Sequence, residues 1–344
     1  MSTTGVWEHE EVVLRRGARS GLQLTVAAHS RALGPAIGGC RVRHYEDWRD
    51  GLADALRLAK AMTLKCAVAG VPFGGGKSVV ALPPSASPEL RLAALEDLGE
   101  LIGSLGGSYI PGPDVGTGPE DMVVLRRHAP QVFCLPPAHG GVGSSSAPTA
   151  VGVLAALRAG ARHVFGSPSV AGRKVVISGF GAVGSHLATA LAADGAAVTV
   201  SDVDDAKRLR AAELGLGWVH PDDAPAEPAD IFVPAAVGGV LSPEVISLLT
   251  APLVVGPANN QLTEDSVAHR LDSQGFTWIP DFVASAGGII YTLAREIRGL
   301  DHAGATAEVE GIEETTDLLL TRARSNGTTP LAEAITLATT RTKP

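Results

Sequence analysis

The sequence contains few aromatic residues, few cysteines and no long run of uncharged apolar residues. Aromatic side chains account for 4% of its 344 residues, so its cores are expected to consist mainly of alanine, valine and leucine. The three cysteines, Cys40, Cys66 and Cys134, are widely spaced and match neither a disulfide framework nor the Cys/His pattern of a metal site. We therefore expect reduced thiols, as in a cytoplasmic protein, and no metal.

Charge and hydrophobicity exclude two classes of partner. The formal net charge is −8 and no long basic run occurs, which argues against nucleic acid or an anionic membrane as the main partner. No run of uncharged apolar residues is long enough to form a membrane span, and residues 1–11 are too polar and acidic for a secretory signal. The expected partner is a small molecule.

Glycine, in contrast, is abundant, and the chain is long enough for about two domains. The 41 glycines exceed the usual share of ~7% and indicate many tight turns and close approaches of the backbone. Residues 131–147 are rich in proline, glycine and serine, as expected of a hinge between two domains.

Two lysines lie within the almost uncharged segment 62–77. A helix predicted over 47–62 comes directly before this segment. Burial and a second nearby cation both lower the pKa of a lysine towards the range of a general base. We interpret Lys65 and Lys77 as meeting over a small anionic substrate; the alternative is two surface lysines beside a glycine turn. A triphosphate-binding loop is excluded, because Val71 stands where that loop needs glycine.

Two further segments each admit a functional and a purely structural interpretation. Gly38 and Gly39, in a glycine-broken loop or strand edge, either turn backbone N–H groups towards a carboxylate or simply form a turn. Asp114 lies in the Pro/Gly-rich bend 109–117. Its carboxylate either shuttles protons at a site or caps a helix predicted over 119–128.

The second half of the chain carries a dinucleotide-binding fingerprint in its full structural context. A buried strand over 174–178 leads into the loop 179–184, which reads Gly-Phe-Gly-Ala-Val-Gly. A helix over 183–193 follows, and a second strand over 197–201 ends at Asp202. This order of elements predicts a Rossmann-type unit.

Each residue of the fingerprint has a physical task. Gly179 makes the tight turn, Gly181 lets the backbone approach the pyrophosphate, and Gly184 allows close packing of helix on strand. The helix N-terminus provides N–H donors for the phosphates. Asp202 can accept hydrogen bonds from a ribose 2′-hydroxyl but would repel a 2′-phosphate, and residues 203–205 are not basic, so NAD is favoured over NADP.

Further strands are predicted over 230–234, 252–256 and 276–279, with helices between them. This alternation is typical of a doubly wound parallel sheet, whose ligands bind beyond the carboxyl ends of the strands. Asn259 and Asn260 follow one such end. They either orient the nicotinamide ribose or carboxamide, or serve only as turn residues.

Taken together, these motifs resemble the Glu/Leu/Phe/Val dehydrogenase family, most closely the NAD-dependent leucine, valine and phenylalanine dehydrogenases. The resemblance extends over nearly the whole chain, and several separate motifs occur in the same order as in the family. The segments that carry it are 34–39, 62–65, 74–77, 114–117, 179–184, 258–262 and 286–288.

The resemblance implies a reversible oxidative deamination, in which an amino acid, NAD and water give a 2-oxo acid, ammonia and NADH. Lys65, helped by the backbone of Gly38 and Gly39, would bind the substrate carboxylate. Lys77 would be the lysine of lowered pKa that activates water and stabilises the carbinolamine oxygen. Asp114 would carry protons to and from the amino group.

The resemblance also implies the architecture. An N-terminal α/β domain, residues 1–142 with 326–344 returning to it, would bind substrate and form the contacts of a homo-oligomer, either a dimer or an octamer. Residues 143–325 would form the Rossmann domain that binds NAD. A cleft between the domains would close over the substrate.

Other site residues follow from the same resemblance. On the substrate side they are Met62, Ile37, Phe133 and Ser285. Phe133 stands where leucine dehydrogenases have a threonine, and Ser285 replaces a family asparagine, so the preferred substrate need not be leucine. The expected cofactor-binding residues are Gly179, Phe180, Gly181, Ala182, Val183, Gly184, Asp202, Val203, Thr149, Ala236, Val237, Asn259 and Asn260.

Two other functions remain open from the sequence. The enzyme could supply an aromatic 2-oxo acid to a specialised pathway, an alternative that the change at Ser285 suggests. The chain could also be an NAD-binding regulator without turnover, although the intact set of Lys65, Lys77 and Asp114 argues against this.

Overall fold

The computed structural model describes residues 8–342, which form two compact units. Within that range, unit 1 contains the residues up to Ser144 together with those from Ala338 on, and unit 2 contains Ser145–Leu337. No helix in the described part of the chain is long and apolar enough to cross a membrane. Each unit has its own sheet.

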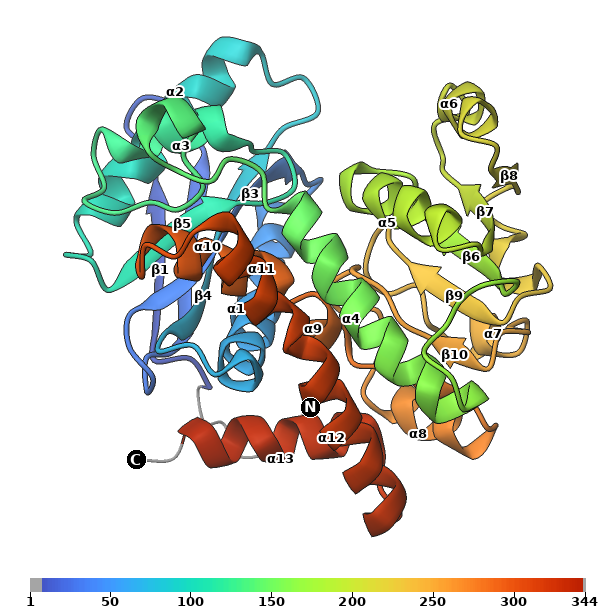
Figure 1. Cartoon of the computed structure of the whole chain (residues 1–344). Coiled ribbons are helices and arrows are strands. Elements are labelled where there is room, and N and C mark those ends of the chain that lie inside the picture. The colour runs from blue at the N-terminus through green and yellow to red at the C-terminus, as the bar shows by residue number, and fades with distance from the viewer. Residues whose placement is uncertain (1–7, 343–344) are drawn as a thin grey trace. The chain divides into compact units, whose positions relative to one another are not determined.

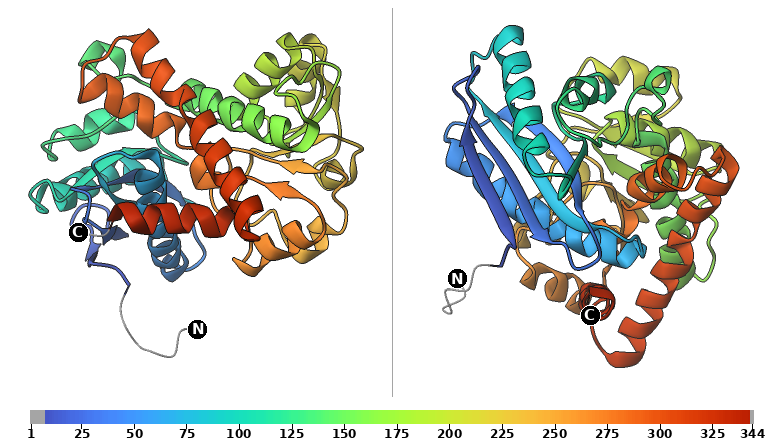
Figure 2. Two further views of the ribbon diagram at one scale, coloured as in Figure 1. Left: turned by 60° about the horizontal axis from the view of Figure 1, so that its bottom comes forward. Right: turned by 90° about the vertical axis from the view of Figure 1, so that its left-hand side faces the viewer.

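Unit 1 is built on a five-stranded mixed sheet with the order β1-β2-β4-β3-β5. β2 is antiparallel to β1 and β4, whereas β3 is parallel to β4 and β5. Figure 2 shows these strands, dark blue to teal, as one twisted layer. Their bounds are β1 (Glu11–Arg16), β2 (Gln23–Ser30), β3 (Ala36–His44), β4 (Gly74–Leu82) and β5 (Tyr109–Pro113).

The two faces of this sheet bury different side chains, because successive residues of a strand point to opposite sides. Val26 and Val80 belong to a core that includes residues of α2 and α3, and the neighbouring Ala27 and Val79 belong to a smaller core with α1. The sheet is therefore covered by helices on both faces. These helices are α1 (Trp48–Ala69), α2 (Pro88–Gly103) and α3 (Pro119–Arg126).

Helix α1 extends beyond the range predicted from the sequence. It continues through Lys65 and ends only at Gly70, which adopts the left-handed conformation with φ of 69°. The expected end at residue 62 was wrong because no glycine or proline interrupts the chain between residues 62 and 70. Lys65 therefore lies on a helix, not in a loop.

Three glycine- or proline-rich segments form parts of strands; the first was expected as a loop or a strand edge, and the other two as a turn and a bend. Gly38 and Gly39 lie in β3, which has neighbours on both sides, and the three glycines 74–76 begin β4. The bend expected around Asp114 is preceded by β5 despite Pro111 and Pro113. Because β5 is an edge strand, it has no neighbouring strand on its outer side. A proline there, which has no N–H group, therefore breaks no hydrogen bond on that side.

Unit 2 contains a parallel sheet of six strands with the order β11-β10-β9-β6-β7-β8. The predicted strands before and after the fingerprint are β6 and β7, and their bounds agree with the prediction. The strand β8 was not predicted from the sequence. The bounds are β6 (Lys174–Ser178), β7 (Ala197–Ser201), β8 (Gly217–Trp218), β9 (Ile231–Pro234), β10 (Leu253–Val254) and β11 (Thr277–Trp278).

Helices connect successive strands of this sheet, as in a doubly wound fold; Figure 1 labels α5, between β6 and β7, and the green α4, which precedes β6. The fold class is therefore the predicted one, two α/β units of which the second is Rossmann-like. The helices are α4 (Ser146–Phe165), α5 (Ala182–Ala193), α6 (Lys207–Glu213), α7 (Pro243–Ile246), α8 (Ser266–Ser273), α9 (Asp281–Ala284), α10 (Gly287–Glu296), α11 (His302–Glu310) and α12 (Ile312–Asn326).

The last helix, α13 (Pro330–Thr342), begins in unit 2 and ends in unit 1. The guanidinium of Arg341 donates hydrogen bonds to the carbonyls of Ala67 and Val68 at 2.9 and 2.6 Å. These carbonyls lie in the last turn of α1, where helical C=O groups have no partner within the helix. Arg341 thus ties the end of the described chain to unit 1.

Candidate functional site

Lys77 and Asp114, which the sequence marked as separate candidates, form an ion pair in unit 1. Lys77 lies on β4, and Asp114 directly follows β5. The Lys77 Nζ and the Asp114 Oδ2 are 2.7 Å apart, and the two side chains are 6% and 13% exposed. The alternative of two surface lysines is wrong, since Lys65 and Lys77 are only 8% and 4% exposed.

The ion pair lies over Gly39 of the intervening strand β3. A Cβ atom at Gly39 would be 2.6 Å from the Asp114 Cβ and 2.9 Å from the Lys77 Nζ. Such distances are shorter than van der Waals contact, so only glycine leaves room for the pair. The requirement for Gly39 thus comes from the two catalytic candidates beside it.

Asp114 does not cap the following helix. The N-cap of α3 is Gly118, whose N–H donates to the carboxylate of Asp121. Burial alone would raise the pKa of Asp114, but the charges of Lys77 and Arg41 outweigh it and lower the pKa below its ordinary value. Asp114 is therefore ionised at neutral pH and acts as an acceptor in this state.

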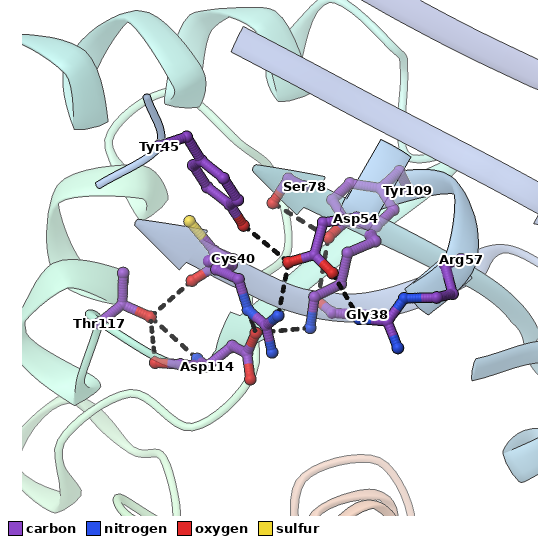
Figure 3. Close-up of polar contacts among 11 residues, drawn as sticks. Gly38, Cys40, Tyr45, Asp54, Arg57, Ser78, Tyr109, Asp114 and Thr117 are labelled. Atoms are coloured by element: carbon purple, nitrogen blue, oxygen red, sulfur yellow. Dashed lines mark hydrogen bonds and ion pairs between the residues drawn. The ribbon is translucent and has the colours of Figure 1, made fainter. Parts of the chain in front are cut away.

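Arg41 is a third charged member of this cluster, which the sequence analysis missed. Its Nε donates to the Asp114 Oδ2 at 2.9 Å, and its other side donates from NH1 to the Asp54 Oδ2 at 2.7 Å. The hydroxyl of Tyr45 donates to the same Asp54 oxygen at 2.7 Å (Figure 3). The one available signal was a charged residue, Arg41, directly after the apolar and glycine residues 36–40 of β3.

The segment around Lys65 packs tightly on the strand that carries Lys77. A Cβ at Gly75 would lie 2.0 Å from the Thr63 backbone nitrogen, so the glycine lets α1 approach β4. Lys65 on α1 lies two residues after Thr63, and Lys77 on β4 lies two residues after Gly75. Met62 precedes it on α1 and is half-buried.

Gly38 and Gly39 form part of a strand and not a turn, but their pairing is irregular. The register between β3 and β4 runs from Ile37 opposite Gly75 directly to Cys40 opposite Ser78 and skips the two glycines. A Cβ at Gly38 would lie 1.8 Å from the carbonyl oxygen of Gly76. Gly38 is therefore required for the close approach of these two strands.

The apolar residues expected around the substrate side chain lie in unit 1. Ile37 is fully buried, and Phe133 is buried with its N–H donating to the Pro111 carbonyl at 2.8 Å. The rings of Phe73 and Phe133 meet edge to face, with 6.2 Å between centroids. Phe73 is thus an aromatic neighbour of Phe133 that the sequence analysis did not name.

In unit 2, the fingerprint loop has the geometry that a dinucleotide pyrophosphate requires. Gly179 has φ of 119°, and a Cβ there would lie 2.5 Å from the Ala236 nitrogen. A Cβ at Gly184 would lie 2.0 Å from the Gly179 carbonyl oxygen, whereas the space beside Gly181 is open. The loop is followed at once by α5, whose first residues are Ala182 and Val183. The open side at Gly181 is the approach that a phosphate needs.

Asp202 is held by three donors at the end of β7. Its Oδ2 accepts from the Phe180 N–H at 2.9 Å and from the Lys207 Nζ at 2.8 Å, and its Oδ1 accepts from the Asp204 N–H at 3.0 Å. Burial would raise the pKa of Asp202, but the hydrogen bond from Lys207 and the two amides lowers it. Lys207 was not foreseen, because it lies five positions after Asp202.

Of Asn259 and Asn260, the second has a strained backbone conformation and a side-chain donor without a hydrogen bond. Asn260 has φ of +52°, and its N–H donates to the Asp281 Oδ2 at 2.8 Å. Among the described residues, its buried side-chain Nδ2 has no hydrogen-bond partner. A buried donor of this kind costs free energy unless a ligand supplies the acceptor, so the residues of unit 2 fit a nicotinamide cofactor.

Other residues expected at the cofactor or substrate are placed as follows. The Thr149 hydroxyl donates to the Ser145 carbonyl at 2.8 Å, and the Ser285 hydroxyl donates to the Asp281 carbonyl at 2.6 Å. Val203 and Val237, by contrast, are 91% and 72% exposed. In residues 8–342, no group of three or more His, Cys, Asp or Glu residues could hold a metal ion.

Comparisons with known proteins find relatives over almost the whole chain. A model of the Glu/Leu/Phe/Val dehydrogenase dimerisation domain matches residues 9–131, and one of the S-adenosyl-L-homocysteine hydrolase NAD binding domain matches residues 165–260. A valine dehydrogenase of Streptomyces albus is 41% identical over 336 residues, 96% of this chain and 91% of the relative. A phenylalanine dehydrogenase of Thermoactinomyces intermedius is 36% identical over 331 residues, 93% of this chain and 88% of the relative. The crystal structure of L-tryptophan dehydrogenase from Nostoc punctiforme gives a TM-score of 0.78 at 31% identity, and the match covers 97% of this chain and 96% of that one.

Proposed function

This chain belongs to the Glu/Leu/Phe/Val dehydrogenase family of NAD-dependent oxidoreductases acting on CH–NH2 donors, and we propose that it catalyses the reversible oxidative deamination of a branched-chain or aromatic L-amino acid. The products would be a 2-oxo acid, ammonia and NADH. The observation that carries the proposal is the buried pair of Lys77 and Asp114 over Gly39.

The substrate carboxylate is assigned to Lys65, with the backbone of Gly38 and Gly39. Lys65 is a buried cation on α1, and the skipped register at the two glycines supports a backbone that turns polar groups towards a ligand. The carboxylate of the substrate and the ammonium group of Lys65 carry opposite charges and would attract each other. Ile37, Met62, Phe133 and Ser285 are proposed to surround the amino-acid side chain.

Lys77 and Asp114 are assigned the proton transfers. Asp114, ionised and held 2.7 Å from Lys77, can take a proton from the substrate ammonium group and return it to the departing ammonia. Lys77 in its neutral form can take a proton from the attacking water, and in its charged form it stabilises the developing carbinolamine oxygen. The two side chains thus exchange roles as acid and base.

The chemistry that NAD would supply when bound is acceptance of a hydride from the substrate α-carbon. The N–H groups at the start of α5, behind Gly181, are proposed to hold the pyrophosphate. Asp202 would accept a hydrogen bond from the adenosine ribose, with Val203 beside it. Asn260 would donate from its unpartnered Nδ2 to the nicotinamide end, supported by Asn259. The remaining assigned contacts are Gly179, Phe180, Ala182, Val183, Gly184, Thr149, Ala236 and Val237.

The choice of substrate is supported by the relatives, which act on valine, phenylalanine and tryptophan according to their names. Purified enzyme with NAD and each of a panel of L-amino acids, followed by NADH absorbance, tests the proposal. We expect one branched-chain or aromatic amino acid to exceed L-glutamate and L-alanine by at least ~100-fold in kcat/KM. The proposal fails if L-glutamate is best or if no amino acid reduces NAD.

The same panel separates the alternative left open by the sequence. An enzyme that supplies an aromatic 2-oxo acid should prefer phenylalanine, tyrosine or tryptophan, and valine or leucine as the best substrate would refute it. The edge-to-face contact of Phe73 with Phe133 favours an aromatic-lined pocket and gives this alternative its structural support.

Assembly, domain limits and compartment complete the proposal. A homo-oligomer, dimer or octamer, is supported by the description of the matched model as a dimerisation domain. We propose that residues 1–142 with 326–344 bind substrate and that 143–325 bind NAD. A cytoplasmic location is supported by the burial of all three cysteines, among which the described chain forms no disulfide.

A further inference from the structure

We infer that Arg41 is a positioning residue of the proposed reaction: it keeps the Asp114 carboxylate oriented and negatively charged while Lys77 is without its proton. Asp54 in turn holds Arg41. This inference rests on the roles proposed above for Lys77 and Asp114, and it concerns two residues outside the set expected from the family.

The first observation is that one oxygen atom has two cationic partners. The Asp114 Oδ2 lies 2.7 Å from the Lys77 Nζ and 2.9 Å from the Arg41 Nε. Arg41 follows Gly39 by two positions on β3, so both residues face the same side of the strand. Lysine can release its proton in a protein site, but the guanidinium of arginine stays charged.

The second observation is that Arg41 is fixed from its far side. Its NH1 lies 2.7 Å from the Asp54 Oδ2, and both side chains are about nine-tenths buried. Asp54 also accepts from the Tyr45 hydroxyl at 2.7 Å and, at its other oxygen, from the Arg57 NH2 at 2.7 Å (Figure 3). Two carboxylates hold the planar guanidinium in one orientation. The position of Asp54 on α1 therefore fixes the position of the Arg41 Nε that binds Asp114.

Charge balance shows why a second cation matters. The charged groups facing Asp114 are Lys77 from β4 and Arg41 from β3, and behind Arg41 lie Asp54 and Arg57 of α1. When Lys77 is neutral, Arg41 is the cation that remains against the buried carboxylate. Without it, burial would favour the protonated acid, which could not accept a proton from the substrate ammonium group.

A purely structural role for Arg41 predicts something different. If the residue only linked β3 to α1, its replacement would reduce stability but leave the pH dependence of turnover unchanged. The pH profile therefore distinguishes the two roles, and the conservative replacement by lysine provides a second distinction.

The kinetic test compares Arg41→Gln, Arg41→Lys and the control Arg57→Gln, which removes a half-exposed donor to Asp54 that does not touch Asp114. For Arg41→Gln we expect kcat to fall at least ~30-fold and the ascending limb of its pH profile to move to higher pH by ~0.5–1.5 units. The reason is that loss of the Arg41 charge raises the pKa of Asp114, so the carboxylate that accepts the substrate proton forms only at higher pH. In Arg41→Lys the ascending limb of the kcat pH profile should return most of the way to its wild-type pH. The kcat of Arg57→Gln should lie within ~3-fold of the wild-type value.

A direct measurement of charge is independent of turnover. In protein labelled with ¹³C at aspartate carboxyls, Lys77→Met should leave Asp114 ionised at pH 7, and Lys77→Met with Arg41→Gln should leave it protonated. The Asp114 signal is identified by its loss in Asp114→Asn. Should the double variant fail to fold, the single variant Arg41→Gln replaces it and should raise the pH at which Asp114 titrates, because the charge of Arg41 is then lost.

The inference is overturned if Asp114 stays ionised at pH 7 in the double variant, or if the Arg41→Gln pH profile coincides with that of the wild type. Failure of the proposed function appears elsewhere, as the absence of amino-acid-dependent NADH formation by the wild type. In that case the carboxyl titration still decides whether Arg41 keeps Asp114 charged.

Discussion

At the scale of single residues, the candidate site depends on the space that Gly39 leaves. Lys77 lies on β4 and Asp114 directly follows β5, and the two meet over this glycine, where a side chain would overlap both. The two charged groups can therefore occupy their positions only because Gly39 has no Cβ atom.

We predict that Gly39→Ala reduces kcat/KM for the best amino acid by at least ~100-fold. The added Cβ would lie 2.6 Å from the Asp114 Cβ and 2.9 Å from the Lys77 Nζ, so the pair must move. A displacement of about 1 Å in a catalytic geometry costs roughly this factor. Steady-state kinetics and urea unfolding should be measured on the same preparation. We expect the free energy of unfolding to fall by ~1–3 kcal/mol.

Gly118→Ala is the matched control, because a Cβ at Gly118 meets no atom within 4 Å and its φ of −139° suits alanine. It should retain kcat/KM within ~3-fold and lose only the small difference between glycine and alanine at an N-cap, at most about 1 kcal/mol. Equal activity of Gly39→Ala and Gly118→Ala would show that the pair over Gly39 is not the reacting centre.

Single residues were predictable from the sequence where their own neighbourhood was unusual. Lys77 was marked by an uncharged, glycine-rich segment and Asp114 by a rigid bend, and both are buried in one ion pair. The pairing of Arg41 with Asp114 and Asp54 was not predictable, since it joins residues 73 and 13 positions apart through the order of the strands.

At the scale of elements, prediction succeeded where the signal was local and periodic. The strands β6 and β7 have their predicted bounds because each is a short apolar run between clear turn signals. It failed at β5, where proline and glycine indicate a bend, and at β3 it left a loop and a strand edge open. The sheet accommodates both, glycine for close approach to β4 and proline at an edge.

The contact between β2 and α1 gives a prediction for stability against pH. The His29 Nδ1 lies 2.9 Å from the Thr63 hydroxyl oxygen. Burial, with smaller contributions from His9 and Lys60, lowers the pKa of His29 to about 4. Between pH 6.5 and 4 the unfolded chain binds a proton that folded His29 does not, so stability falls as the pH is lowered through this window.

We predict that His29→Gln removes part of this acid destabilisation. Each pKa unit corresponds to about 1.4 kcal/mol, and solvent screening of the half-buried ring reduces the expected effect to about 1 kcal/mol. Urea unfolding at pH 7 and pH 5 measures it, with exposed His186→Gln as the control that keeps the wild-type difference. An unchanged difference in His29→Gln would contradict the assignment.

At the scale of the whole molecule, two units divide the proposed work. Substrate and proton-transfer residues belong to unit 1, apart from Ser285, and the residues assigned to NAD belong to unit 2. Membership of the Glu/Leu/Phe/Val dehydrogenase family rests on similarity along almost the entire chain. A change confined to the Lys77–Asp114 pair should therefore affect chemistry without affecting cofactor binding.

The most direct test is Lys77→Ala, in which NADH formation from the best amino acid and NAD binding by calorimetry are measured on one preparation. We predict a loss of at least ~10³-fold in kcat/KM, as expected for removal of a general acid–base group. The dissociation constant for NAD should stay within ~3-fold of the wild-type value. Activity within ~10-fold of the wild type would contradict the assignment of Lys77, and with it the proposed site.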